Sequence, residues 1–205
     1  MDILYSDSAI AVCVKPVGVD SEHGLPQMLS EALGGQVFPI HRLDANVGGV
    51  MVFARTKKAA AELSRAVQDG TMIKEYVALV QGLPPKSGDW TDLLFKDSRK
   101  NKVFVVDRER KGVKKARLEF TRLTAQAPAL VRVRLHTGRS HQIRVQFASR
   151  GYPLLGDHKY GARDQRTAPA LFSCRLTFPY QGRNVQFEAF PDWYEERFSP
   201  QNVQN

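Results

Sequence analysis

The sequence predicts an α+β fold in which a mixed, mostly antiparallel central sheet carries flanking helices. Segments with the pattern of a strand outnumber those with the pattern of a helix, and no regular crossover helices separate them. Residues 129–136 alternate apolar and basic side chains, as a strand with one buried face does. The chain shows no internal repeat, low-complexity tract or interdomain linker, so residues 1–205 are expected to form a single domain.

The first elements are short. Residues 3–15 predict two strands separated by a turn at residues 6–8, and residues 15–24 predict a loop because proline and glycine interrupt any regular pattern. Residues 26–33 predict a helix with Pro26 in its first turn, ended by two glycines.

The next segments alternate between strand and helix. Residues 50–55 predict a strand, and a helix is expected from about Lys57, with Thr56 as its N-cap and Gly70 beyond its end. Residues 73–82 predict another strand.

The second half continues the sheet. Residues 116–124 and 129–136 predict an antiparallel pair, and strands are also expected near residues 170–178 and 184–190. Between them, residues 137–153 predict a loop that enters a helix capped by Ser140. The polar tail, SPQNVQN, is expected to fray.

The charge of the chain is concentrated. The formal net charge is +9 and the isoelectric point is near 9.7, which favours a polyanionic partner. Residues 96–117 hold ten basic and three acidic side chains. The interpretation we prefer is a mobile basic arm that neutralises phosphates, and the alternative is a solvated hairpin without a partner.

Composition also indicates the compartment. Cys13 and Cys174 lie in apolar segments without paired spacing, which favours buried, reduced thiols in a cytosolic protein over a disulfide. The N-terminus lacks the features of a signal peptide, and no apolar run is long enough to span a membrane. We therefore expect a soluble, cytoplasmic protein.

Several kinds of site have no support. The five histidines do not stand in HExxH or paired-cysteine spacing, so a metal enzyme is not indicated. No GxGxxG or Walker loop is present, which argues against a nucleotide cofactor, and no GxSxG elbow supports a serine hydrolase.

Three segments carry residues suited to chemistry. Asp44 follows HRL directly before an apolar strand, although a lone aspartate after a turn is more often solvated. Tyr76 lies on one face of a predicted strand, where its phenol could line a pocket. GRSHQIR opens a helix whose exposed amides would suit a phosphate, with Arg144 one turn in. A carboxylate, a pairing arginine and an aromatic wall would together hold a flipped base.

At this point the sequence resembles the RluA-type pseudouridine synthases. The resemblance runs from about Tyr5 to Pro191, and the motifs that carry it, in chain order, are YSDSAIAVCVKPVGV, HRLDANVGGVMVFART, KEYVALVQG and TGRSHQIRVQFASRGYPLLGDHKYG. It implies the pseudouridine synthase catalytic fold and isomerisation of uridine to pseudouridine in structured ribosomal or transfer RNA, without a metal or nucleotide cofactor.

The resemblance also implies roles for individual residues. Asp44 would be the catalytic carboxylate, acting at the sugar or the base, two routes that the sequence leaves open. Tyr76 would stack on the target base, and Arg144 would pair with Asp44 and keep it ionised. Arg42 would fill the space left by the flipped nucleotide, and Ile143 would pack against the pocket. RNA contacts are also expected from Arg139, His141, Lys114 and Lys115.

Two departures from the family pattern bear on these expectations. The chain has Val47-Gly48-Gly49 where the family usually has Thr-Ser-Gly, so two hydroxyls beside the catalytic loop are missing. Many relatives also carry an N-terminal S4 domain, for which this chain has no room, so RNA selection would fall to the basic segment 96–117.

Two rival functions share part of this pattern. A non-catalytic RNA-binding module on the same fold would use the same charge. A glycosidase with paired carboxylates lacks a convincing second acid, because Glu75 should point away from Tyr76 and Asp157 lies in a loop interpreted as structural. A monomer is the default expectation.

Overall fold

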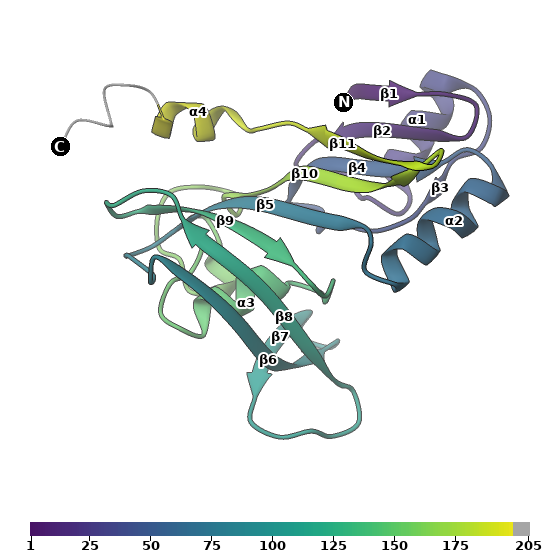
Figure 1. The fold of residues 1–205 in the computed structure, drawn as a ribbon. Coiled ribbons are helices and arrows are strands. Elements are labelled where there is room, and N and C mark those ends of the chain that lie inside the picture. The colour runs from purple at the N-terminus through teal and green to yellow at the C-terminus, as the bar shows by residue number, and fades with distance from the viewer. Residues whose placement is uncertain (199–205) are drawn as a thin grey trace. The chain divides into compact units, whose positions relative to one another are not determined.

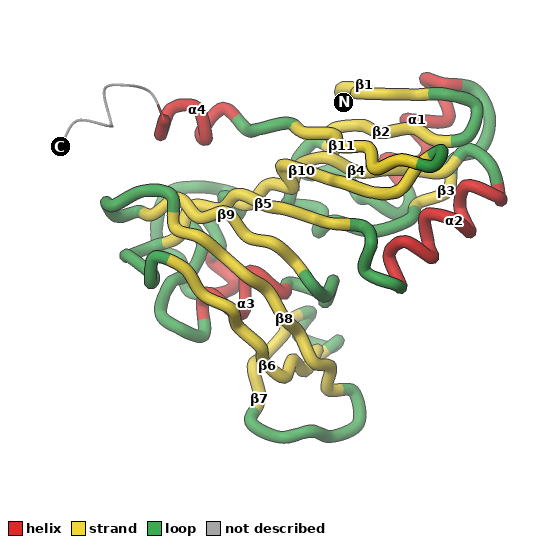
Figure 2. The backbone as a smooth tube through the Cα atoms, viewed as in Figure 1, coloured by secondary structure: helices red, strands yellow, loops and turns green. Residues whose placement is uncertain are grey.

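Strands dominate the structure, as the sequence predicts (Figure 2). The computed structural model describes residues 1–198, and the chain divides into two units: residues 1–74 with residues from 172 onward, and residues 75–171. The strands pair mostly antiparallel, while β10 pairs with β4 in parallel, and four α-helices accompany them in the described residues. The predicted fold class is confirmed.

The first unit is built on a sheet with the strand order β1-β2-β4-β10, to which β11 adds beside β10 and β3 beside β4 (Figure 1). Its elements are β1 (Asp2–Ser6), β2 (Ile10–Lys15), α1 (Gly24–Leu33), β3 (Phe38–Pro39), β4 (Gly48–Ala54), α2 (Lys57–Gln68), β10 (Leu171–Tyr180), β11 (Arg183–Glu188) and α4 (Asp192–Phe198).

Strand β4 is the centre of this sheet. All seven of its residues are buried, and it pairs with β2 on one side and with β10, in parallel, on the other. This explains why its sequence is an unbroken apolar run rather than an alternating one. The position of β4 fixes the backbone that directly follows the HRLD segment.

Helix α2 follows the expectation closely. The Thr56 hydroxyl accepts a hydrogen bond from the Ala59 amide at 3.1 Å, and Gly70 lies beyond the last turn with a φ of +76°. Its apolar face buries Ala59, Leu63 and Ala66 against the sheet core. Helix α1 begins two residues earlier than predicted and keeps Pro26 in its first turn.

The second unit has the strand order β5-β9-β8-β6-β7. Its elements are β5 (Ile73–Val80, whose first two residues belong to the first unit), β6 (Ser87–Asp97), β7 (Lys102–Val106), β8 (Val113–Arg122), β9 (Ala129–Leu135), α3 (Gln142–Ala148) and the 3₁₀ turn η1 (His158–Tyr160). The predicted antiparallel pair of β8 and β9 is confirmed.

Strands β6 and β7 were not predicted from the sequence. The basic segment 96–117 contains the last two residues of β6, all of β7 and the first five residues of β8, so it forms an antiparallel ribbon with two turns rather than a long irregular arm. Ser87, Gly88 and Asp89 open β6, and these residues have weak strand propensity. Pairing along β8 therefore decides the conformation of this segment.

Helix α3 differs from the expectation at its start. The predicted cap, Ser140, is wrong: the N-cap is His141, in the left-handed region at φ +50°, and its side chain makes no capping hydrogen bond. Inside the unit, Trp90, Phe120 and Phe147 form a tilted aromatic cluster with centroids 4.4 to 5.2 Å apart. This cluster packs α3 against β6 and β8.

Other expectations concern the cysteines, the membrane and the C-terminus. Cys13 and Cys174 are buried thiols rather than a disulfide, as predicted, and burial raises the pKa of Cys13 to about 12. No helix among residues 1–198 is long and apolar enough to cross a membrane. The predicted fraying of residues 199–205 lies outside the described residues, and helix α4 was not predicted.

Candidate active site

The loop that carries Asp44 is held in place by the buried ammonium group of a lysine. Lys15, at the end of β2, is fully buried and donates hydrogen bonds to the carbonyls of Pro16, Val19 and Ala45 at 2.8 to 2.9 Å. Burial lowers the pKa of Lys15 to about 8, although the carboxylates of Asp20 and Asp44 favour its charged form. The residue next to Asp44 is thus tied to the edge of the sheet.

Two further side chains fix the residues on the other side of Asp44. The buried Ser21 hydroxyl donates to the Leu43 carbonyl at 2.8 Å and accepts from the Leu43 amide at 3.2 Å. The His41 Nε2 accepts from the Val52 amide of β4 at 3.3 Å. Burial, with the nearby Lys74 ammonium, lowers the pKa of His41 to about 3, so the ring is neutral at pH 7. The backbone on both sides of Asp44 therefore has a fixed place.

The Val47-Gly48-Gly49 segment has a packing explanation in this chain. Val47 is buried, and a Cβ added at Gly48 would lie 3.2 Å from the Phe172 ring and from the Lys15 carbonyl. Gly49 has a φ of +130°, and a Cβ there would collide with the backbone of Ser173. Phe172 thus occupies the space beside Gly48 that a side chain would need.

Arg42 lies on the surface of the first unit. Its guanidinium is 3.1 Å from the Glu22 carboxylate, and 61% of its side chain is exposed. An ion pair this exposed contributes little to stability. Arg42 is therefore accessible to a ligand, and its predicted role in RNA binding stays a prediction.

In the second unit, Arg144 forms a buried ion pair with Asp157. Nε lies 2.6 Å from Oδ2 and a terminal nitrogen lies 2.8 Å from Oδ1, with 8% and 1% of the two side chains exposed. The structural role predicted for Asp157 agrees with this burial. The predicted partner of Arg144, Asp44, belongs to the first unit, and that pairing stays a prediction.

Tyr76 and Ile143 lie in the second unit together with Arg144. Tyr76 on β5 is 5% exposed, and Ile143 on α3 is 3% exposed. Both side chains are therefore almost fully buried in the structure. Their predicted contacts with a target nucleotide stay predictions.

The start of α3 is held by side chains rather than open to a ligand. Gln142 accepts from the Thr137 hydroxyl at 2.8 Å and donates to the Arg117 carbonyl at 3.0 Å. Residues Gln142 to Phe147 are all buried. The expectation of exposed amides forming a phosphate seat here is therefore wrong.

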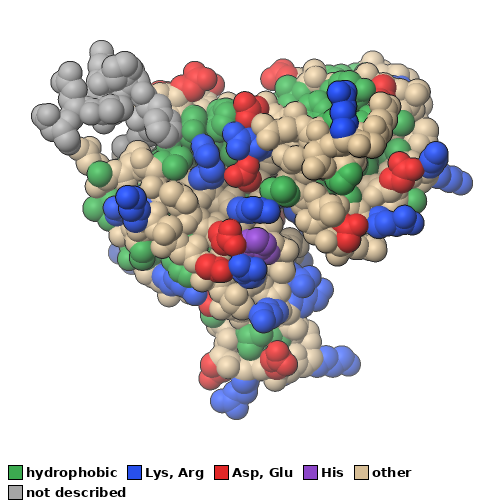
Figure 3. Space-filling view, in the orientation of Figure 1, with side chains coloured by type: hydrophobic (Ala, Val, Ile, Leu, Met, Phe, Trp, Pro, Cys, Tyr) green, Lys and Arg blue, Asp and Glu red, His purple; other side chains and the backbone are tan. Residues whose placement is uncertain are grey.

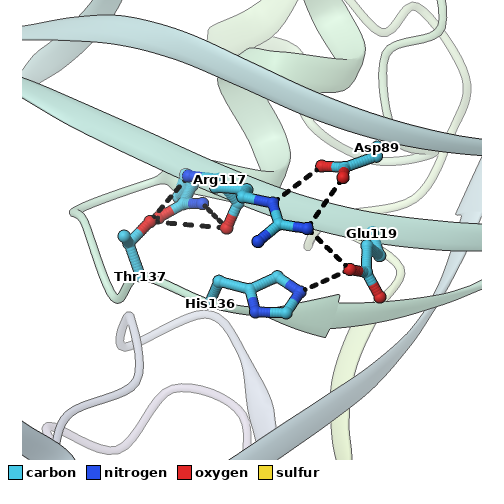
Figure 4. A network of polar contacts seen from close by, with 6 residues as sticks. Asp89, Arg117, Glu119, His136 and Thr137 are labelled. Atoms are coloured by element: carbon cyan, nitrogen blue, oxygen red, sulfur yellow. Dashed lines mark hydrogen bonds and ion pairs between the residues drawn. The ribbon is translucent and has the colours of Figure 1, made fainter. Parts of the chain in front are cut away.

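The outer face of β8 and β9 is only partly basic. Arg117 pairs with Asp89 at 2.8 Å and with Glu119 at 3.0 Å, and His136 lies 2.9 Å from Glu119 (Figure 4). Of the basic face that the sequence predicted for residues 129–136, His136 therefore lies beside an acidic side chain.

The basic segment carries its charge on the surface. Lys114 and Lys115 are exposed, and Arg139 is exposed while its Nε donates to the Lys115 carbonyl at 3.0 Å. In Figure 3, lysine and arginine side chains surround the end of the β6–β7–β8 ribbon. The Arg110 guanidinium lies 4.6 Å from the Phe95 ring centroid. This surface is suited to phosphates.

Sequence reasoning missed two residues that hold the Asp44 loop: Lys15 and Ser21. Lys15 and Ser21 act through contacts with residues 22 to 30 positions away, so no local spacing reveals them. A lysine directly after an apolar strand was the one available signal. Residues 1–198 contain no group of three His, Cys, Asp or Glu side chains placed to hold a metal ion.

Comparisons with known proteins agree with this architecture. The family model described as RNA pseudouridylate synthase matches residues 9–149. The dual-specificity RNA pseudouridine synthase RluA of Escherichia coli K12 is 33% identical over 204 residues, covering 93% of each chain. An uncharacterized RNA pseudouridine synthase of Aquifex aeolicus is 33% identical over 201 residues, which cover 88% of this chain and 63% of that protein.

Solved structures show the same fold. The human RNA pseudouridylate synthase domain containing 4 superposes with a TM-score of 0.80 at 23% identity, over 95% of this chain and 90% of that one. The human RNA pseudouridylate synthase domain containing 1 gives 0.81 at 24% identity, over 98% and 85%. The anchored aspartate loop, the family match and the similarity along almost the whole chain lead to one conclusion: this chain belongs to the RluA family of RNA pseudouridine synthases.

Proposed function

We propose that this protein isomerises one or more specific uridines to pseudouridine in structured ribosomal or transfer RNA, by flipping the target nucleotide and using Asp44. The C1′–N1 bond breaks, the base turns, and a C1′–C5 bond forms while the hydrogen on C5 is lost and N1 gains a proton. Atoms and electrons are conserved, so the step needs no oxidant, reductant or water.

The anchoring of the Asp44 loop is the observation that carries this proposal. The Ser21 side chain holds the backbone of Leu43, and the Lys15 side chain holds that of Ala45. The His41 ring is bonded to β4, and Asp44 itself is only half-buried. A carboxylate held on a rigid backbone is preorganised for attack or proton transfer. A merely solvated aspartate would gain nothing from having both of its neighbours fixed.

The other site residues receive roles from the same proposal. Arg144 keeps the Asp44 carboxylate ionised and oriented, and Tyr76 stacks on the flipped uracil with Ile143 beneath it. Arg42 takes the place of the flipped nucleotide in the stack. The rigid, buried setting of Arg144 supports its part, because a guanidinium already held by Asp157 cannot swing away.

RNA selection is assigned to exposed basic groups. Lys114 and Lys115 lie on β8, and Arg139 donates a hydrogen bond to the Lys115 carbonyl. His141, two residues after Arg139, is the N-cap of α3. Their contacts to phosphates would offset the free energy needed to extract a base from its stack. The protein would act as a monomer in the cytoplasm, where its buried thiols remain reduced.

The test uses RNA labelled with tritium at uridine C5, transcribed from ribosomal and transfer RNA genes. Each conversion releases tritium into water, and carbodiimide mapping then locates the product. The wild-type protein should release tritium from particular transcripts, and Asp44→Asn should release none while binding the same RNA with similar affinity.

A matched control keeps the result specific. Asp2→Asn changes an exposed aspartate of the same unit and should retain full activity. Binding without tritium release by the wild-type protein on every transcript would instead support a non-catalytic RNA-binding module. Full activity of Asp44→Asn would exclude the catalytic role of Asp44.

A further inference from the structure

The phenol of Tyr160 joins two parts of the second unit that the proposed function uses separately. Its hydroxyl accepts a hydrogen bond from the Val103 amide at 2.9 Å and shares another with His141 Nδ1 at 2.9 Å. Val103 belongs to β7, the edge strand of the basic ribbon, and His141 is the N-cap of α3. One oxygen atom thus connects the ribbon to the helix of Arg144.

The ring of Tyr160 makes the same connection through its face. The guanidinium of Arg144 lies 5.2 Å from the ring centroid, and the ammonium of Lys102 on β7 lies 5.3 Å from it. The ring also packs on the small apolar cluster around Val103, Ala116 and Val145. A cation from the ribbon and the site arginine are therefore held by one aromatic group.

The backbone around Tyr160 ties it to the partner of Arg144. The Tyr160 amide donates to the Asp157 carbonyl at 2.9 Å, while the Asp157 carboxylate holds Arg144. Lys159, the preceding residue, donates to the Asn101 carbonyl in the turn before β7 at 3.0 Å. The loop 157–160 therefore touches Arg144 on one side and the ribbon on the other.

We propose that Tyr160 is a positioning residue of the synthase, which transmits the placement of the basic ribbon to Arg144 through His141 and the first turn of α3. The proposal rests on the proposed function, since it assumes that the ribbon binds RNA and that Arg144 serves Asp44. Because Arg144 serves the chemical step in that function, the effect of Tyr160 should fall mainly on that step.

The geometry of α3 explains how a small shift reaches Arg144. The Val145 amide donates to the His141 carbonyl at 2.9 Å, so the His141 backbone accepts a hydrogen bond that closes the helical turn containing Arg144. His141 occupies a left-handed conformation that most residues avoid, and a bond on its ring stabilises that backbone. Without this bond, the turn is held less firmly, and the Arg144 guanidinium can shift by a fraction of an ångström together with Asp157.

The decisive variant is Tyr160→Phe, which removes one oxygen and keeps the ring. It should lower kcat roughly tenfold with little change in KM or in the salt dependence of RNA binding, because misplacing a site residue by a fraction of an ångström has effects of this order. Hydrogen exchange should be faster at the Val103 amide, and the melting temperature should fall by a few degrees because this buried amide loses its acceptor.

A second variant breaks the same bond from the other end. His141→Gly keeps a residue that tolerates the left-handed conformation and has no side chain to reach the phenol. If the effect runs through this bond, kcat of the double variant should equal that of the more impaired single variant. Tyr152→Phe, which removes a phenol oxygen from the same unit, is the matched control and should behave as the wild type.

The outcomes separate the two levels of the proposal. Wild-type kcat in Tyr160→Phe, a change confined to KM, or effects that multiply in the double variant would overturn the positioning role while leaving the proposed function intact. Absence of tritium release by the wild-type protein itself would overturn the proposed function, and the positioning role with it.

Discussion

The Arg144 guanidinium and the Asp157 carboxylate form a two-point ion pair inside the second unit, with nitrogen to oxygen distances of 2.6 and 2.8 Å. Asp157 lies only thirteen residues along the chain, in the loop that also holds Tyr160. The pair fixes the plane of the guanidinium, because both oxygens of one carboxylate engage it. Arg144 is thus oriented by its own unit.

Replacing Asp157 should damage both stability and activity. Asp157→Asn leaves a buried guanidinium without its counter-charge, so the free energy of unfolding should fall by about 3 kcal/mol or more. Urea unfolding measures this decrease, and tritium release should fall with it. Asp107→Asn, which changes an exposed aspartate of the same unit, should alter neither stability nor activity. An unaltered urea midpoint for Asp157→Asn would contradict the buried ion pair.

Lys15 provides a second test of the anchored loop. Lys15→Met nearly keeps the length of the side chain but removes the donor that three backbone carbonyls share, so the free energy of unfolding should fall by about 2 kcal/mol. Because one of these carbonyls belongs to Ala45, kcat should also fall at temperatures where the variant is fully folded. Lys58→Met on the exposed face of α2 is the control. A folded Lys15→Met with normal kcat would show that Asp44 does not need this anchor.

Acid stability should depend on Asp7. Partial burial alone would raise the pKa of Asp7, but hydrogen bonds from the hydroxyls of Tyr180 and Tyr5 and the amides of Ile10 and Ala9 lower it to about 2. A carboxyl whose pKa is lower in the folded state stabilises the protein above its unfolded value of 3.8, and this contribution disappears as the pH falls towards 2.

Asp7→Asn should therefore lower the free energy of unfolding by about 1 to 2 kcal/mol at pH 7. The difference from the wild type should shrink as the pH is lowered from 4 to 2. Chemical denaturation across this pH range measures both quantities, with Asp2→Asn as the exposed control. A difference that grows in acid would refute this assignment.

The ribbon charge should govern RNA affinity. Lys114→Glu with Lys115→Glu should weaken binding roughly tenfold at low salt, and should reduce the slope of log affinity against log salt by about 0.7 to 0.9 for each phosphate that is no longer neutralised. Lys57→Glu with Lys58→Glu makes the same charge change on α2 of the first unit. Equal effects of the two double variants would indicate non-specific electrostatic attraction of the RNA. An unchanged salt slope for the Lys114 and Lys115 variant would show that these two lysines do not contact the RNA.

The sequence by itself determined the elements whose information is local and the family that its motifs define. Strands β2, β4, β5 and β9 are indicated by apolar runs or alternation, and α2 by its Thr56 cap and apolar stripe. HRLD and GRSHQIR, in their order, identified the pseudouridine synthases because such motifs keep fixed chemistry at fixed places.

Tertiary structure decided what depends on residues far apart in the chain. Strand β6 exists because β8 pairs with it, although its own sequence opens with weak strand formers. The N-cap of α3 is His141 rather than Ser140, and the first helical residue, Gln142, is hydrogen-bonded to Thr137 and Arg117. Hydrogen bonds of this kind leave no periodic signal.

The same holds for the groups that position the site. Lys15 meets Ala45 across thirty residues, and Tyr160 meets Val103 across fifty-seven. The identity of Asp44, Tyr76 and Arg144 was available from motifs, whereas what holds the Asp44 loop and the Arg144 guanidinium in place was not. Burial and hydrogen bonding are properties of the folded chain, so only the fold could reveal them.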